Sequence, residues 1–244
     1  METNDVNVHV TLDTFIGQQN IIENLKISIA AAKMRKETLG HILLSGSKGS
    51  GKSALAYAVA DELNVNISIS SFNEIRTPSD LAAVLTSLNE GDVLIVENFD
   101  AITPECAELF YSAMKMFCMN VVVGKGPSAR NIRLDLPSFT LIAIMDIKRS
   151  VIPKLMDCFF LNIALMGYST DELIQLAKRW SLLNNTDITD EAAKIIALYA
   201  DGSNRRLTNV LKRARDFATI INNGTINLDV ADKTINAMLS SDFV

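Results

Sequence analysis

A glycine-rich segment at 46–53, Gly-Ser-Lys-Gly-Ser-Gly-Lys-Ser, follows the pattern GxxxxGK[ST] at every position. In this pattern the glycines let successive backbone N–H groups turn toward phosphate oxygens, the lysine neutralises the β- and γ-phosphates, and the final hydroxyl ligates Mg²⁺. A chance Gly- and Ser-rich turn is the alternative, but an apolar strand-like run precedes the segment and a helix-like run follows it, as phosphate binding requires. The segment therefore predicts a site for ATP or ADP with Mg²⁺, and its candidate residues are Gly46, Gly49, Gly51, Lys52 and Ser53.

The elements that must position this loop alternate between strand and helix patterns. Short aliphatic runs predict strands at 41–45, 65–69, 92–96, 139–145 and 159–165. Helical spacing of apolar residues predicts helices at 21–36, 52–63, 78–88 and 104–117. Residues 119–123 and 131–136, joined by a glycine-bearing segment, predict a β-hairpin. We expect an α/β domain whose parallel sheet is covered on both faces, with the last aliphatic runs forming buried strands.

After Gly167 the pattern is only helical, with amphipathic stretches at 171–183, 190–200, 205–221 and 229–239. Four helices that each carry one apolar face form a small bundle when these faces meet. The sequence therefore predicts two domains, a P-loop nucleotide-binding domain at 1–167 and a small all-α lid domain at 168–244.

Composition narrows the functional classes. The 244 residues are 48% hydrophobic and 21% charged, so the chain should fold throughout. A net charge of −5 argues against a broad grip on nucleic acid, and we expect direct DNA binding to be weak or indirect. Three cysteines without a CxxC pair argue against a disulfide framework or a zinc site. With no apolar run long enough for a membrane helix, a cytoplasmic protein is expected.

Several segments occur in the order that is typical of one known family: Leu12–Gln18, Leu25–Arg35, Gly91–Leu94, Gly124–Pro137 and Phe139–Ile142. On these segments the chain resembles the RuvB-type Holliday junction branch migration motors of the AAA+ class. The resemblance implies an adenine pocket entered at Phe15 and Ile16, and a γ-phosphate sensor at Arg205 at the start of the third lid helix. It also implies a C-terminal winged-helix domain for DNA, which would begin where this chain stops, after Val244. The ending is compatible with a truncated chain and also resembles a natural terminus.

Two candidate catalytic positions depart from the family. Its third strand ends in Asp-Glu, and the matching residues here are Glu97 and Asn98. Glu97 keeps a carboxylate and could hold Mg²⁺ together with Ser53. Asn98 could hold a water but cannot accept its proton at neutral pH, and the loss of a general base costs about 10² to 10⁴ in rate. An alternative role for Asn98 is to cap the following turn.

The polar sensor and the arginine finger of the family are also replaced. Its Thr-Thr-Arg sensor corresponds to Met145-Asp146-Ile147, where Asp146 either repels the γ-phosphate or is a solvated loop residue. Its Pro-Leu-Arg-Asp-Arg-Phe run corresponds to 154–159, with Met156 and Cys158 in place of the arginines. An arginine finger supplied in trans contributes about 10³ to 10⁵ in phosphoryl transfer. Lys154 or Arg149 could replace the arginine finger, but neither occupies the matching position in the family's pattern. Lys154 also lacks the planar guanidinium group.

The hairpin resembles the element through which the family binds a RuvA partner. Apolar residues match that pattern at Val121, Val122, Val123, Ile132 and Leu134. Ordinary strand packing would explain part of this set, and an apolar face that protrudes from the domain would favour partner binding. A RuvA-like protein, and a ring formed with identical or different subunits, are therefore the expected partners.

These observations predict a RuvB-like AAA+ nucleotide-binding protein that is deficient in hydrolysis and acts as a binding or regulatory module. The alternative is an active ATP-dependent branch migration helicase subunit in DNA recombination and repair. A third interpretation, another AAA+ activity such as a loader or adaptor, is compatible with the fold. The replaced groups at Asn98, Met156 and Cys158 favour the first interpretation.

Overall fold

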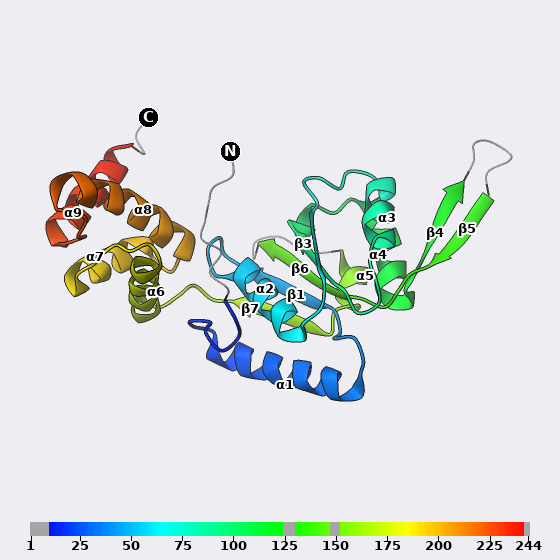
Figure 1. The fold of residues 1–244 in the computed structure, drawn as a ribbon. Coiled ribbons are helices and arrows are strands. Elements are labelled where there is room, and N and C mark those ends of the chain that lie inside the picture. The colour runs from blue at the N-terminus through cyan, green and yellow to red at the C-terminus, as the bar shows by residue number, and fades with distance from the viewer. Residues whose placement is uncertain (1–9, 124–129, 147–151, 242–244) are drawn as a thin grey trace.

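Residues 10–123, 130–146 and 152–241 are described by the structure, a computed structural model of the chain. The first domain is built on a five-stranded parallel sheet in the order β2-β3-β6-β1-β7 (Figure 1). Its strands are β1 (Ile42–Gly46), β2 (Ile67–Ser71), β3 (Val93–Glu97), β6 (Thr140–Asp146) and β7 (Leu161–Leu165). Parallel strands need crossover connections, and here helices supply them.

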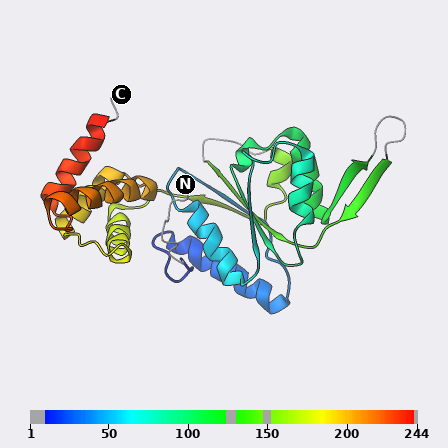
Figure 2. The ribbon, with the colours of Figure 1, turned by 45° about the horizontal axis from the view of Figure 1, so that its top comes forward.

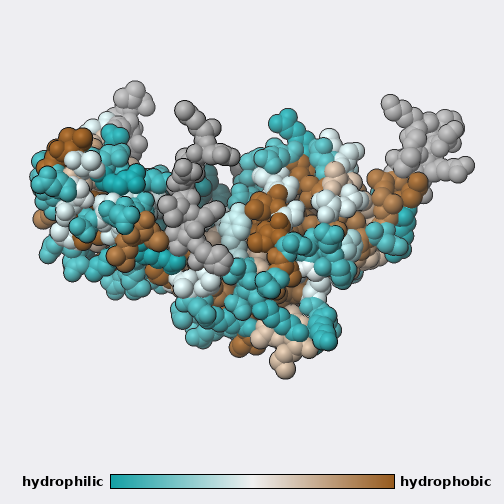
Figure 3. Space-filling view, viewed as in Figure 1, coloured by the Kyte–Doolittle hydropathy of each residue, from teal (hydrophilic) through white to brown (hydrophobic). Residues whose placement is uncertain are grey.

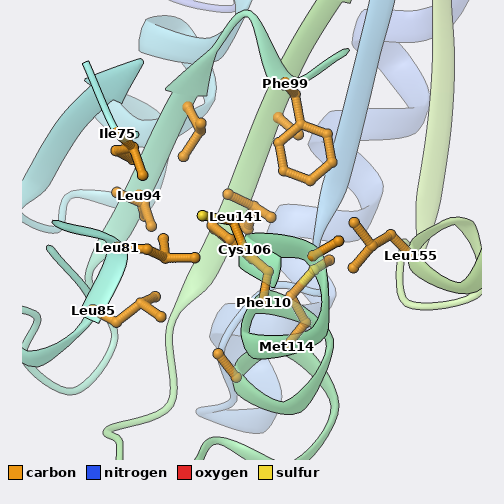
Figure 4. Packing of buried hydrophobic residues seen from close by; sticks show 14 of the residues in the cluster. Ile75, Leu81, Leu85, Leu94, Phe99, Cys106, Phe110, Met114, Leu141 and Leu155 are labelled. Atoms are coloured by element: carbon orange, nitrogen blue, oxygen red, sulfur yellow. The ribbon is translucent and has the colours of Figure 1, made fainter. Parts of the chain in front are cut away.

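Helices cover both faces of this sheet, as the sequence predicts. Two lie on one face, α1 (Gln19–Arg35) and α2 (Lys52–Leu63), and three on the other, α3 (Pro78–Thr86), α4 (Pro104–Met116) and α5 (Pro153–Met156). Successive strand residues point to opposite faces, so Leu94 packs with α3 and α4 while Ile95 packs with α1 and α2. Figure 4 shows the first of these cores around Phe99, Phe110 and Leu141.

The run at 159–165 does not form a fully buried strand, and that prediction is wrong. Within β7 only Leu165 is buried, while Asn162 and Ala164 are exposed. The physical reason is its place in the sheet, because β7 is an edge strand that pairs only with β1. The strand β2, at the opposite edge, is likewise largely open to solvent.

A separate two-stranded hairpin consists of β4 (Cys118–Val123) and β5 (Arg130–Asp135). Its strands pair antiparallel, with Val121 opposite Ile132 and Met119 opposite Leu134. Figures 1 and 2 both show the hairpin projecting from the end of the domain away from the lid. The predicted insertion is thus present and extends beyond the sheet.

The second domain is a bundle of four helices, α6 (Thr170–Leu183), α7 (Asp190–Ala200), α8 (Asn204–Ile221) and α9 (Leu228–Ser241). Its core is formed by their apolar faces, including Ile196, Val210 and Leu211, which are fully buried. The predicted fold class, a parallel α/β core with an inserted hairpin and a helical lid, is confirmed. Within the described ranges, none of the helices combines the length and the apolar character that crossing a membrane requires.

Candidate functional site

The glycine-rich loop connects β1 to α2, with α2 beginning at Lys52. Gly49 and Gly51 have φ of +87° and +93°, a left-handed backbone that favours glycine. A Cβ on Gly51 would also lie 2.4 Å from Tyr168 Oη, so a side chain there has no room. The loop is therefore shaped by its glycines and ends at the N-terminus of a helix, which attracts phosphate.

The Lys52 ammonium is held inside this loop. It donates hydrogen bonds to the carbonyl oxygens of Gly46, at 2.7 Å, and Ser47, at 2.9 Å. It also lies 3.4 Å from Asp146 Oδ1, a residue that follows 94 positions later in the chain. Lys52 is thus placed at the centre of the loop, next to an acidic group.

The two residues predicted to hold Mg²⁺ lie together. Ser53 Oγ donates a hydrogen bond of 3.0 Å to Glu97 Oε1, which brings the start of α2 to the end of β3. In the described part of the chain, no group of three or more His, Cys, Asp or Glu side chains could hold a metal ion. Mg²⁺ commonly uses one or two protein ligands with substrate phosphates, and this pair fits that requirement.

Asn98 is engaged differently from Glu97. Its backbone is left-handed, with φ of 51°, and it begins the 3-10 turn η1 (Phe99–Ala101). Its side chain makes no capping hydrogen bond to that turn; instead Nδ2 donates to Ser71 Oγ at 3.0 Å, across to β2. Asn98 therefore occupies the N-cap position of this turn, as the alternative predicted, and its backbone carbonyl accepts from the Ala101 amide at 2.9 Å, while its side-chain amide is bonded to a neighbouring strand.

The residues that the sequence places at the family's arginine-finger positions, as an expectation, pack against the domain. Met156 and Cys158 are partly buried against the core around α4. Lys154 forms an ion pair of 2.6 Å with Glu108, and its ammonium lies 4.3 Å from the centre of the Tyr111 ring. Both of these contacts of the Lys154 ammonium are made within the same chain. Ile147 and Arg149, also considered above, lie outside the described residues.

The lid contacts the phosphate loop directly. The Asn204 amide donates to the Gly49 carbonyl at 3.0 Å, and Ser203 Oγ donates to the Lys48 carbonyl at 3.1 Å. These two residues begin α8, so the N-terminus of this helix also points at the loop. A Cβ on Gly49 would lie 2.2 Å from Ser203 Oγ, which shows how closely the two domains approach.

A cleft of about 740 Å³ opens between the loop and the lid. Glu97, Asn98, Asp146 and Arg205 all line it, as do Lys52 and Ser53. Among the lining residues that sequence reasoning did not identify are Lys48, Thr208, Asn209 and Lys212. The last three follow Arg205 at spacings of three, four and seven, which place them on one face of a helix, and this spacing could have indicated them.

Phe15 and Ile16 are not in this set of lining residues. Phe15 is buried in the core beneath the loop, and a Cβ on Gly51 would lie 3.2 Å from its ring. Tyr168, at the start of the lid, lies on the same side of Gly51, and burial, with a smaller effect from Glu172, raises its pKa to about 12. Burial, with a smaller effect from Glu97, also raises the pKa of Tyr57 on α2.

The hairpin residues predicted to contact a partner divide between half-buried and exposed. Ile132 is 42% exposed and Leu134 is 38% exposed, while Val121 is half-buried. The side chains of Val122 and Val123 lie outside the described set. Figure 3 shows hydrophobic surface on the projecting hairpin. Packing on the domain therefore does not account for all of its apolar residues.

Comparison with known families matches residues 9–165 to the Holliday junction DNA helicase RuvB P-loop domain and residues 168–240 to the RuvB AAA lid domain. A curated relative from Kosmotoga olearia, the Holliday junction branch migration complex subunit RuvB, is 43% identical over 215 residues. The match covers 88% of this chain and 63% of the relative, so the chain spans less than two thirds of that protein's length.

Solved structures of RuvB proteins have a similar fold to this chain. The Thermotoga maritima RuvB Holliday junction branch migration motor is 35% identical, with a TM-score of 0.82 over 93% of this chain and 71% of that chain. A point mutant of Thermotoga maritima RuvB is also 35% identical, with a TM-score of 0.84 over 93% of this chain and 72% of that chain.

Proposed function

Because the chain belongs to the RuvB family, we propose that it is a nucleotide-binding and regulatory member of that family which hydrolyses ATP poorly or not at all. The loop would bind the phosphates through its backbone and Lys52, and Ser53 with Glu97 would hold Mg²⁺. Arg205 would contact the nucleotide from the lid. Gly46, Gly49 and Gly51 would provide the close backbone approach, and Phe15 and Ile16 would form the entrance of the adenine pocket.

The observation that carries this proposal is the state of Asn98. A neutral amide stands where the attacking water needs a proton acceptor, and that amide is hydrogen-bonded to Ser71. The absence of arginine at 156 and 158 acts in the same direction, because a ring of such subunits has no matching cation to offer a neighbour. The losses of rate expected from these replacements are not additive, because catalytic groups that act as a unit cannot contribute separately.

Bound nucleotide would then act as a structural ligand. Residues of both domains line the cleft, so a ligand there would meet the core and the lid. A ligand that binds only the folded, closed form stabilises it to a degree that rises with ligand concentration. The protein would use ATP or ADP to fix the lid on the core and so present a defined surface to a partner.

We propose the hairpin as the partner surface, with a RuvA-like protein or a second ring subunit as the partner. Ile132 and Leu134 support this assignment because exposed aliphatic residues on a projecting hairpin are typical of a binding site. DNA contact would be indirect, since the net charge is −5.

Steady-state ATP hydrolysis with saturating Mg²⁺ tests the proposal, with Lys52→Ala as the background control. We expect the wild-type rate to equal that control, and Asn98→Glu with Met156→Arg to exceed it. Asn98→Gln with Met156→Arg is the matched variant, because it adds the same length at the left-handed position without the carboxylate. Wild-type turnover that Lys52→Ala abolishes would instead support the active branch migration helicase subunit.

A further inference from the structure

Asp146 is the last residue of β6, at the point where the phosphate loop begins. In the sheet register its partner on β1 is Gly46, the first glycine of the loop. Its carboxylate lies 3.4 Å from the Lys52 ammonium, and its side chain is 41% exposed to the cleft. The second acidic residue in the cleft lining, Glu97, is engaged by Ser53. Asp146 thus puts a negative charge beside the lysine that must meet the terminal phosphates.

The Lys52 ammonium has three N–H donors, and its neighbours account for all of them. Two go to the carbonyl oxygens of Gly46 and Ser47, and the third is directed to Asp146. A phosphoryl oxygen that approaches Lys52 must therefore displace or adjoin a carboxylate. The negative charges of the phosphoryl oxygen and the carboxylate would repel each other when both lie against one ammonium, and the repulsion grows where water is partly excluded.

This repulsion is not the same for the two nucleotides. In a P-loop the backbone N–H groups hold the α- and β-phosphates, while the lysine reaches the β- and γ-phosphates. The β-phosphate would have the loop amides to offset the charge of Asp146. The γ-phosphate would extend beyond the amides into the region that Lys52 and Asp146 share.

We infer that Asp146 makes this site selective for a nucleoside diphosphate over the corresponding triphosphate. The inference rests on the proposed nucleotide binding and adds how many phosphates the bound nucleotide carries. The resident nucleotide would then be ADP, and the carboxylate of Asp146 would stand in for the γ-phosphate as the anion that pairs with Lys52. Arg205 and Lys212 would remain near the diphosphate from the lid.

Equilibrium titrations with fluorescent ADP and a fluorescent, hydrolysis-resistant ATP analogue, both with Mg²⁺, test this inference. We expect wild-type protein to bind ADP about tenfold more tightly, a difference of about 1.4 kcal/mol. Asp146→Asn, which keeps the size and removes the charge, should bind the analogue about tenfold more tightly than wild type does, and ADP within about twofold of wild type. Asp135→Asn is the matched control, because it removes an exposed carboxylate on the hairpin and should leave the ratio unchanged.

The outcomes separate the inference from the proposed function. Equal affinity ratios in wild type and Asp146→Asn, with nucleotide still bound, would overturn the inference alone. If neither nucleotide binds to any variant, the proposed function fails and the inference fails with it. Wild-type ATP turnover that Asp146→Asn abolishes would contradict the proposed function, and it would contradict the inference as well, because the carboxylate would then serve the triphosphate.

Discussion

The amide of Asn204 donates a hydrogen bond of 3.0 Å to the carbonyl of Gly49, so the first residue of a lid helix is bonded to the phosphate loop. Ser203 makes a parallel contact with Lys48. The lid does not merely lie near the nucleotide site, because its helix completes one wall of it. Any change at this contact should therefore alter nucleotide affinity as well as stability.

Gly49→Ala tests the contact between the domains. The new Cβ would meet Ser203 Oγ and the Arg205 amide on a left-handed backbone, so both strain and collision are introduced. Gly91→Ala is the matched control, since its φ of +84° gives similar strain and no atom lies within 4 Å. Both should lose about 1 kcal/mol of unfolding free energy from the strain. Only Gly49→Ala should weaken ADP binding, and equal effects on binding would contradict the account.

His41 predicts a pH dependence of stability. Burial lowers its pKa below the ordinary 6.5, partly offset by its hydrogen bond to Met114. The contacts fit the neutral ring, because Nε2 lies 3.0 Å from the Met114 carbonyl and Nδ1 accepts from the Leu141 amide at 3.0 Å. The unfolded chain takes up the proton first as pH falls. The stabilising contribution is therefore complete above the ordinary pKa of 6.5 and is lost as pH falls from there toward the folded pKa.

Urea unfolding between about pH 5 and pH 8 should show this loss, with a slope from His41 of at most about 1.36 kcal/mol per pH unit. His41→Gln should be less stable at the upper end of this range but should lose this component of the slope. The same slope in both proteins below the ordinary histidine pKa would show that another group is responsible.

The hairpin predicts a loss of partner binding without a loss of fold. Ile132→Asp with Leu134→Asp should abolish capture by a RuvA-like protein, because the charges would have to be buried at the contact. The melting temperature should change little, since both side chains are exposed. Met34→Asp with Ile27→Asp places the same two charges on exposed apolar residues of α1 and is the matched control. Capture unaffected by the double change would remove the hairpin as the partner surface.

Much of the fold follows from local patterns in the chain. The helix predicted at 52–63 is α2 over the same residues, because its alanines and leucines follow helical spacing directly after the loop. The turn η1 and the helix α5 were not predicted, since three or four residues are too short to show a period. The exposure of β7 was missed because an aliphatic run does not reveal whether a strand lies at the edge of a sheet.

Some features of the candidate site could likewise be predicted from the sequence, and others could not. The loop and the Ser53–Glu97 pair could be placed from motif and order, because parallel strands end at one edge of the sheet. The contact between Lys52 and Asp146 could not, since it depends on the pairing of strands that are far apart in sequence. Nor could the hydrogen bond from Asn98 to Ser71, because it depends on a left-handed backbone at a single residue.

Single-turnover chemistry tests the central claim most directly. Protein in excess over radiolabelled ATP, with Mg²⁺, is quenched at intervals, and bound nucleotide is identified after each interval. The account predicts that ATP is bound, that Lys52→Ala prevents this binding, and that the bound label stays triphosphate over many minutes. Rapid conversion of the bound ATP to ADP and phosphate by the wild-type chain would contradict it.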